Sequence, residues 1–445
     1  MTTQTEYFAL LALALVLAAT ACTRPVHDYP YCSDEQTQDT PRVSSAVTWH
    51  QDVRPIIEGR CMRCHTEGAI GPFPLETYED AFRTREAIKT SVVERTMPPW
   101  LPASCCNSFL DNFSLTDAQI ATVEAWVDQG APEGDELTPG ASLSRVGGLS
   151  RVDVTISMAE GYKPEPKPGR VDDFRCFVID WPLDERKFVT GINPIPGARA
   201  ILHHLVIGVA TGPDARPYED IESPDGKPGF PCTGGLGDLS VTSIIGGGLA
   251  GGDFPEGFGT PVDPDSKIIL SVHYSIADAG PEEDFTSIEF KLDDDAQPTN
   301  TFVLVNPMWL VDRAMFVPAG DPDVVHQFRY DPAIFTGRRP VRIIGFTPHM
   351  HYLGTRVRAA IIRKGTGERV CLAEIPKWDF GWEQPYWFKE SVVLQPGDDL
   401  YIDCHFDNTQ ENQPIVGGQR AEPIDVAWGS DNQAMCSGFL NYAPL

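Results

Sequence analysis

Five of the ten histidines in this chain lie in three short stretches that read as β-strands. These are His203 and His204 in ILHHLVIGV, His273 in IILSVHYSI, and His349 and His351 in FTPHMHYLG. A methionine, Met435 in NQAMCSGFL, follows near the C-terminus. Imidazole nitrogen serves copper in both oxidation states, and thioether sulfur is a soft ligand that favours Cu(I). The pattern predicts two copper ions per chain, one bound by three histidines and one by two histidines and the methionine.

The spacing within each stretch decides which side chains can reach one ion. Residues i and i+2 of a strand share a face, so His349 and His351 are expected to bind together. Adjacent residues such as His203 and His204 point to opposite faces. Their joint ligation requires a local twist or bulge, or else only one of them binds. Taken singly, His273 reads as a core histidine and Met435 as a packing residue, so the prediction rests on the whole set.

A second set of chemistry-bearing residues lies upstream, in Cys61-Met62-Arg63-Cys64-His65. This is the covalent attachment motif of a c-type haem. It predicts one haem c, with both cysteine thiols bonded to the porphyrin and His65 as proximal ligand. Met97, held before Pro98 and Pro99, is the expected sixth ligand, and a methionine opposite histidine raises the haem potential. The alternative is that Met97 only packs.

The N-terminus indicates export. The apolar run of residues 8–21 is too short to span a bilayer and has the length of a signal-peptide core. Small residues before Cys22 resemble a bacterial lipobox, so we expect Cys22 to be lipidated. The protein is then a periplasmic or outer-membrane lipoprotein that touches membrane through its lipid anchor alone. The alternatives are a plain secretory signal or a wrongly chosen start codon.

Composition narrows the class of partner. A net charge of −28 and a pI near 4.6 argue against nucleic acid, which requires a basic surface. Eleven cysteines suit an exported protein. The sequence alone leaves open how several of them pair, namely Cys32, Cys105, Cys106, Cys176, Cys232 and Cys371.

The chain is expected to be multidomain: a small all-α cytochrome c domain followed by two all-β jelly-roll or sandwich domains. Residues 1–22 form the signal peptide and 23–47 a tether. Residues 48–135 form the cytochrome domain, with three helices around the haem motif, the last starting at Ser114 with Asp117 three residues later. Residues 136–150 form a linker. The copper-binding β-domains cover 151–298 and 299–445.

The motif order His-His, His, His-x-His-x-Leu-Gly and Met-Cys, over about residues 165–445, resembles the copper type II, ascorbate-dependent monooxygenases. This family includes dopamine β-monooxygenase and peptidylglycine α-hydroxylating monooxygenase. The segments FPEGFG at 254–259 and GDDLYIDCHF at 397–406 add to the likeness. The resemblance assigns an electron-storage copper to the three-histidine set and the oxygen-binding, catalytic copper to His349, His351 and Met435. It also implies a disulfide between Cys404 and Cys436.

The resemblance further implies that O2 hydroxylates a C–H bond of a small organic substrate, with the two coppers facing each other across a gap between the β-domains. The positions that grip a peptide carboxylate in the amidating relatives are Thr347, Ser437 and Phe439 here, so a glycine-extended peptide is not expected. Electrons are expected from an ascorbate-like reductant or a periplasmic redox protein, relayed by the haem. The alternative is a haem and copper electron-transfer or O2-reducing protein that hydroxylates nothing.

Overall fold

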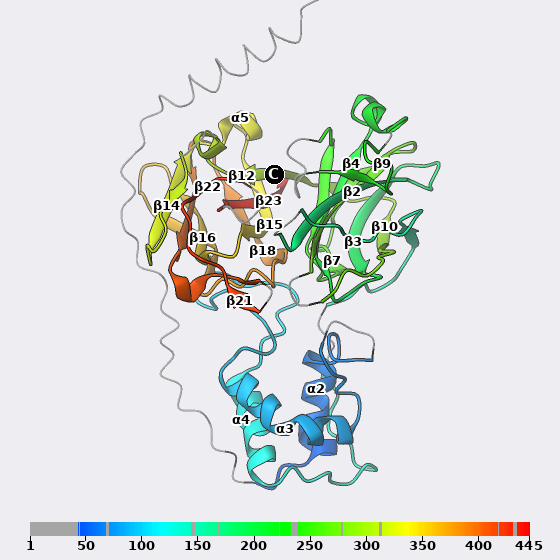
Figure 1. The fold of residues 1–445 in the computed structure, drawn as a ribbon, viewed down its shortest axis with the longest axis vertical. Helices are drawn as coiled ribbons and strands as arrows, with labels where there is room; N and C mark the ends of the chain where they lie inside the picture. Colours follow the sequence, from blue (N-terminus) through cyan, green and yellow to red (C-terminus); the bar gives the residue numbers. More distant parts are fainter. Residues whose placement is uncertain are drawn as a thin grey trace, which may run out of the picture.

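The computed structural model describes residues 43, 45–67, 71–143, 147–167, 170–221, 223–232, 239–276, 279–310, 314–416, 418–429 and 434–445. Cys22 and its apolar leader lie outside these residues. Helices gather in the N-terminal part and strands make up nearly everything after it, in two lobes that lie side by side above the helices (Figure 1). This arrangement is consistent with the two expected β-sandwich domains.

The helical region has a hydrophobic core of its own. Its elements are η1 (Trp49–Val53), α2 (Arg54–Arg60), α3 (Tyr78–Val93) and α4 (Asp117–Asp128). Trp49 and Trp126 pack with ring centroids 5.8 Å apart, and both are buried. A capping box starts α4, in which the Thr116 side chain accepts from the backbone N–H of Gln119. The predicted N-cap at Ser114 is therefore wrong by two residues. Thr116 and Gln119, three residues apart, accept hydrogen bonds from the free backbone N–H groups at the start of the helix.

Between α3 and α4 the chain leaves the helices and joins the second β-lobe. We call residues 98–113 the connecting segment. A disulfide links Cys106 to Cys371 in β17 (Arg369–Ile375). The backbone N–H of Leu110 donates to the Trp387 carbonyl at 2.8 Å, and Phe109 is buried in the core of the second lobe. The region predicted as one cytochrome domain thus contributes a stretch of chain to a β-lobe.

The first lobe consists of two packed sheets. One has the order β1 (Val154–Ser157), β10 (Ser287–Asp293), β3 (Lys187–Ile195), β8 (Phe258–Val262), β11 (Gln297–Pro298), with β7 (Gly252–Asp253) beside β3. The other has the order β5 (Phe230–Pro231), β2 (Asp172–Asp180), β9 (Lys267–Ser275), β4 (Leu202–Ala210), β6 (Ser243–Gly247). Burial alternates strictly along β10, so every second side chain enters the core between the sheets. Two short 3-10 turns, η2 (Gly212–Asp214) and η3 (Arg216–Tyr218), follow β4, and a disulfide joins Cys176 to Cys232.

The second lobe is built in the same way. One sheet has the order β12 (Asn300–Leu304), β23 (Cys436–Pro444), β15 (Val341–Met350), β18 (Tyr386–Leu394). The other has the order β14 (Val324–Tyr330), β19 (Asp399–Phe406), β16 (Gly354–Ile362), β17. Short pairs β13 (Phe316–Val317) with β22 (Val426–Ala427) and β20 (Ile415–Val416) with β21 (Gln419–Arg420) lie outside them. The turns η4 (Pro307–Leu310), α5 (Ala333–Thr336) and η5 (Gln410–Asn412) complete the lobe.

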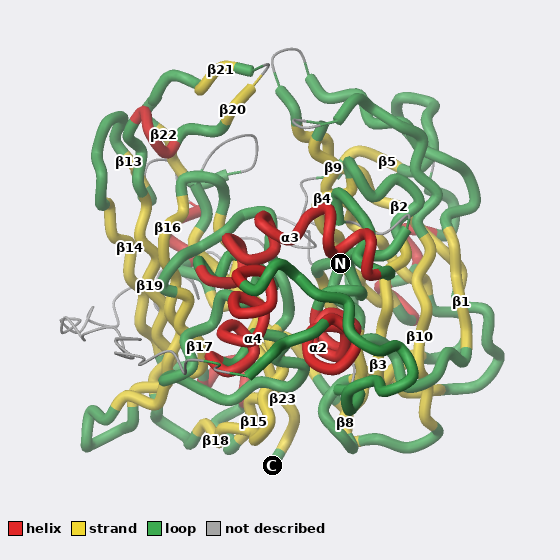
Figure 2. Tube along the Cα trace, turned by 90° about the horizontal axis from the view of Figure 1, so that it is seen from below, coloured by secondary structure: helices red, strands yellow, loops and turns green. Residues whose placement is uncertain are grey.

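The lobes are packed against each other. Ile344 and Trp387 belong to the second lobe but are buried in the core cluster of the first, where Trp387 lies 4.7 Å from the Phe254 ring. Seen from below, the helices lie under the line where the two lobes meet (Figure 2). The helical region is therefore close to both lobes at once.

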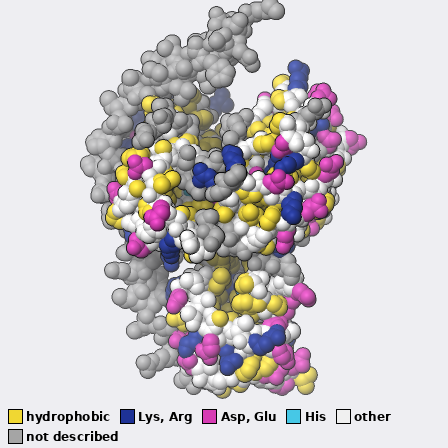
Figure 3. All heavy atoms as spheres, viewed as in Figure 1, with side chains coloured by type: hydrophobic (Ala, Val, Ile, Leu, Met, Phe, Trp, Pro, Cys, Tyr) yellow, Lys and Arg dark blue, Asp and Glu magenta, His cyan; other side chains and the backbone are white. Residues whose placement is uncertain are grey.

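Carboxylates dominate the charged surface. Asp and Glu number 63 against 35 Lys and Arg, and the face shown in Figure 3 carries more acidic than basic side chains. In the part of the chain that the structure describes, no helix has the length and apolarity needed to cross a bilayer.

We predict that Arg358→Ala strongly destabilises the second lobe. The Arg358 side chain is 2% exposed, and its Nε donates to Asp403 at 2.9 Å. Removing one partner of a buried pair leaves an uncompensated charge, at a cost of about 3–5 kcal/mol. Thermal unfolding should show a clearly lower midpoint.

Arg83→Ala is the control, since Arg83 is 72% exposed and pairs with Asp80 on one helix face. Its cost should be below about 0.5 kcal/mol. Equal shifts for the two variants would contradict the assignment of Arg358 as a buried structural charge.

Candidate metal centres

The three-histidine set forms a compact cluster in the first lobe. His203 and His204 lie on β4, and His273 lies on the neighbouring strand β9. Each offers one nitrogen, and these atoms all lie within 4.8 Å of one another. The strand register shifts between Leu202 and His204, where the ladder has the irregularity that joint ligation by adjacent residues requires.

The nitrogens of this cluster are arranged to receive a metal ion. His203 Nδ1 and His204 Nδ1 face each other at 2.9 Å. The Nε2 atom of His273 is 3.0 Å from Asp172 Oδ1, while its Nδ1 is buried and finds no hydrogen-bond partner in the part of the chain that the structure describes. Metal-binding histidines commonly donate one ring N–H to a carboxylate and keep the other nitrogen for the metal. The donor set fits copper.

The second set of candidate ligands lies in the second lobe, on the other side of the boundary between the lobes. His349 is near the end of β15, His351 directly follows that strand, and Met435 precedes β23. His349 Nε2 lies 3.2 Å from Met435 Sδ, and the rings of His349 and His351 are 5.2 Å apart. The sulfur and both imidazoles are thus near neighbours, a donor set that suits Cu(I).

The methionine is held by its chain neighbour. Cys436, the next residue, forms a disulfide with Cys404 in β19. This is the pairing that the resemblance implies. It fixes the start of β23 against the opposite sheet, and with it the position of Met435.

The two sets are adjacent. The rings of His204 and His349 lie 6.2 Å apart, so the predicted gap between the domains is wrong for this structure. The space is filled by residues 378–385, between β17 and β18, which we call the bridging loop. Phe380 of this loop stacks on His203 at 4.3 Å and lies 5.8 Å from His351. One aromatic ring therefore contacts both sets.

The bridging loop also carries a buried carboxylate between the sets. Glu383 is 5% exposed. Its Oε1 is 2.6 Å from His349 Nδ1, and its Oε2 is 3.8 Å from His204 Nδ1. Sequence reasoning missed Glu383, Phe380 and Asp172. The signal for Glu383 was an acidic residue inside the aromatic-rich run WDFGWEQPYW, which also contains Asp379.

Burial sets the protonation of the histidines. It lowers the pKa of His203 and His204 well below the ordinary range, and the neighbouring His273 adds to the effect. For His349 burial also acts to lower the pKa, but the nearby Glu383 carboxylate outweighs it and the net shift is upward. Neutral imidazoles at His203 and His204 are the form that binds metal.

The haem motif follows α2 directly. Cys61 and Cys64 are free thiols, whereas every other cysteine that the structure describes is disulfide-bonded. His65 Nδ1 lies 2.9 Å from the Phe73 carbonyl oxygen, which orients the ring and directs Nε2 elsewhere. These residues fit covalent haem. Met97 is 44% exposed after α3, and its role as sixth ligand stays a prediction.

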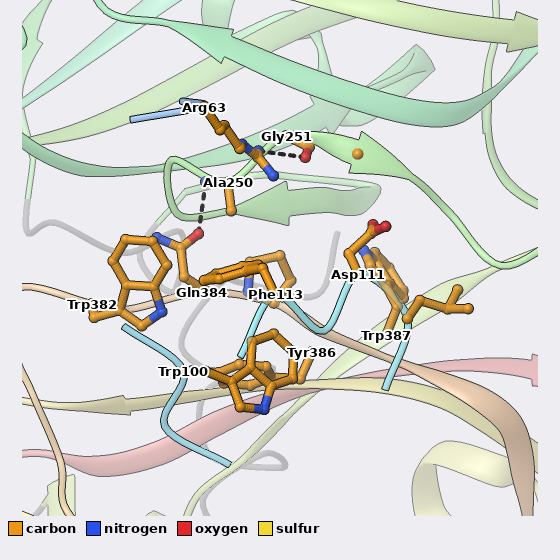
Figure 4. Close-up of a pocket in the computed structure, with 13 residues that line it drawn as sticks. Arg63, Trp100, Asp111, Phe113, Ala250, Gly251, Trp382, Gln384, Tyr386 and Trp387 are labelled. Atoms are coloured by element: carbon orange, nitrogen blue, oxygen red, sulfur yellow. Dashed lines mark hydrogen bonds between the residues drawn. The ribbon is translucent and has the colours of Figure 1, made fainter. Parts of the chain in front are cut away.

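A pocket joins the haem motif to the bridging loop (Figure 4). Arg63, between the two cysteines of the motif, donates through Nη2 to the Gly251 carbonyl at 2.7 Å. Gln384 accepts from the backbone N–H of Ala250 at 2.7 Å. Aromatic rings from the connecting segment and the bridging loop line the rest, with Phe113 and Trp382 centred 5.7 Å apart.

A second, smaller pocket has Glu383 in its lining. Thr347 and Phe439, two of the positions compared with the carboxylate-gripping residues of the amidating relatives, line it. Val206 and Ile244 add apolar surface, and no basic side chain is among the residues that line this pocket.

Comparison with known proteins agrees with the metal-binding geometry. Residues 334–444 match the family model described as "Copper type II ascorbate-dependent monooxygenase, C-terminal domain". The chain is also 23% identical over 368 residues to DBH-like monooxygenase protein 1 of Homo sapiens, covering 75% of this chain and 56% of that relative. The protein of the same name from Gallus gallus is 22% identical over 342 residues, covering 70% and 49%.

These findings support the copper type II, ascorbate-dependent monooxygenase family, and with it copper as the metal. The chain spans about half the length of the curated relatives it matches. Among solved structures, the VP2 subviral particle of infectious bursal disease virus aligns at 11% identity over 67% of this chain and 75% of that chain, with a TM-score of 0.17. That value is too low to inform the fold.

Acid should destabilise the metal-free protein. An unfolded histidine has a pKa near ~6.5, and the pKa of folded His203 and His204 is lower. Below that pH the unfolded chain binds more protons, so the free energy of unfolding falls as pH drops, by at most about 1.4 kcal/mol per pH unit for each group. His349 acts oppositely, because its raised pKa gives stability that is lost as pH rises.

Unfolding of the metal-free protein between pH 7.5 and 5 measures this slope. Burial also lowers the pKa of His326, and the three lowered histidines should outweigh the one raised histidine. A His203→Gln, His204→Gln variant removes two of the three lowered groups and should make the slope shallower. An unchanged slope would show that His203 and His204 do not cause the pH dependence of the unfolding free energy.

Proposed function

We propose that this protein is an exported copper-dependent monooxygenase that hydroxylates a C–H bond of a small organic molecule with O2. The observation that carries the proposal is the convergence of six potential copper ligands from two lobes into two adjacent sets. The family match over residues 334–444 supports the same activity.

Each set would hold one copper ion. His203, His204 and His273 would bind the ion that stores an electron, and His349, His351 and Met435 the ion that meets O2. When bound, copper would supply the one-electron chemistry by which O2 is reduced, with one oxygen atom entering the substrate and the other leaving as water.

The chain's own residues prepare this chemistry. Asp172 accepts from His273 Nε2 and Glu383 from His349 Nδ1, which leaves the opposite ring nitrogens for metal. Phe380 stacks on His203 and covers one face of that ring. The 6.2 Å between the rings of His204 and His349 supports direct electron exchange between the two sites.

The substrate is proposed to be apolar in the part that reacts. Thr347 and His349 lie two residues apart on β15 and so share a face, and Phe439 pairs with Thr347 on β23. The pocket beside them has an apolar side formed by Val206, Ile244 and Phe439. Its other lining includes Thr301, Glu383 and Asn441, and no described residue of the lining offers a basic group for a carboxylate. This supports an apolar or aromatic substrate over a glycine-extended peptide.

We further propose that haem c at Cys61, Cys64 and His65 passes electrons to the copper sites. Arg63 lies inside the haem motif and contacts Gly251 of the first lobe. The pocket above it reaches Trp382, the chain neighbour of Glu383. The donor to the haem would be a periplasmic redox protein, and ascorbate would reduce the copper directly. Lipidation at Cys22 and a periplasmic or outer-membrane location belong to this proposal.

Metal content and product labelling test the enzyme activity. Wild-type protein should contain two coppers and one low-spin haem, and 18O2 should label an organic product. Met435→Leu keeps the volume but removes the sulfur, so turnover should fall at least about 100-fold while copper at the three-histidine site remains. O2 consumption without labelled product would instead support an oxidase or electron-transfer protein.

The haem relay is tested by Cys61→Ala, Cys64→Ala in the full chain. Deleting residues 48–135 would also remove the connecting segment and its disulfide with Cys371, so point substitutions are the cleaner change. The variant should lose covalent haem and turnover with a protein donor, yet keep turnover with ascorbate. Loss of both activities in a folded, copper-loaded variant would count against the relay.

A further inference from the structure

We propose that Glu383 is a positioning residue shared by the two copper sites. Its carboxylate fixes His349 and sets how far His204 lies from that histidine. The inference rests on the proposed function and deepens it, because it names a residue that neither the ligand pattern nor the comparisons assign.

The two carboxylate oxygens face different sites. Oε1 lies 2.6 Å from His349 Nδ1, the distance of a strong charge-assisted hydrogen bond. Oε2 is buried, has no hydrogen-bond partner among the described residues, and lies 3.8 Å from His204 Nδ1. A buried carboxylate oxygen without a partner is costly, so its place beside a ligand nitrogen calls for an explanation. A cation held by His204 would supply the missing charge next to Oε2.

The bridging loop is clamped so that Glu383 cannot drift toward one lobe. Its backbone belongs to the second lobe, between β17 and β18. Gln384 accepts from the Ala250 backbone N–H, in the first lobe. A side chain at Gly248 would come within 2.6 Å of the Glu383 carbonyl oxygen, and Gly248 itself donates to the Leu205 carbonyl of β4. The loop is therefore seated directly on the strand that carries His203 and His204.

Asp172 provides the contrast. It accepts from His273 Nε2 at 3.0 Å and has no described contact with the second set. Asp172 would orient one ligand of one site. Glu383 touches a ligand from each lobe, so changing it should alter both sites.

The test measures copper affinity at each site separately. His351→Ala weakens the methionine site and leaves the His349 contact in place, so it isolates the three-histidine site. His273→Ala isolates the methionine site without touching Glu383. In each background, Cu(I) affinity is measured by competition with a chromophoric chelator, and the Cu(II) EPR spectrum is recorded.

Glu383→Gln should weaken copper binding in both backgrounds by about 10- to 100-fold, the usual effect of losing a partner of a metal ligand. Asp172→Asn should do so only where the three-histidine site remains. Glu390→Gln, the same change at an exposed position on β18, should leave both affinities unchanged. The unfolding temperature of each metal-free variant reports its folding.

Glu383→Asp keeps the charge but shortens the reach by one methylene, so it too should lose affinity at one or both sites. Wild-type affinity in this variant would overturn the positioning role. An effect of Glu383→Gln in one background alone, or in neither, would overturn the shared role. If the wild-type protein binds fewer than two coppers, the proposed function itself is contradicted, regardless of the effect of the Glu383 variants.

Discussion

Both candidate copper sites depend on the contact between the bridging loop and the first lobe. Each lobe has its own core, and each supplies three potential ligands. Three contacts set the relative position of the two ligand sets. Trp387 is buried in the core of the first lobe, Gln384 accepts a hydrogen bond from the Ala250 backbone, and the loop packs closely against Gly248. Because packed cores resist continuous deformation, this interface holds the imidazoles of both lobes at a fixed distance.

The close approach of the two sets changes the physical demands on the site. Rings 6.2 Å apart leave little room for bulk water between them, so the charges of two metal ions would be poorly screened by solvent. A buried carboxylate between the sets offsets part of that charge. This gives one electrostatic reason for the Glu383 carboxylate in a loop that is rich in aromatic residues.

Local rules of chain geometry account for the candidate ligands that the sequence predicts. The two-residue period of a strand predicts that His349 and His351 act together, and the need for a bulge at His203 and His204 is met by the shifted register of β4. Asp172 and Glu383 were missed because their role depends on strands and loops distant in sequence. The packing of the connecting segment was missed for the same reason. The helical patterns on either side of it do not indicate that Phe109 is buried in a β-lobe.

The disulfide between Cys106 and Cys371 spans 265 positions of the chain. During synthesis, residues 98–113 emerge long before the strand that receives them, and the whole first lobe is made in between. Phe109 and its aromatic neighbours must stay exposed until the C-terminal lobe arrives. The compartment in which the chain matures therefore has to shield that segment and keep its thiols from pairing wrongly, so completion of the N-terminal region waits on the last third of the protein.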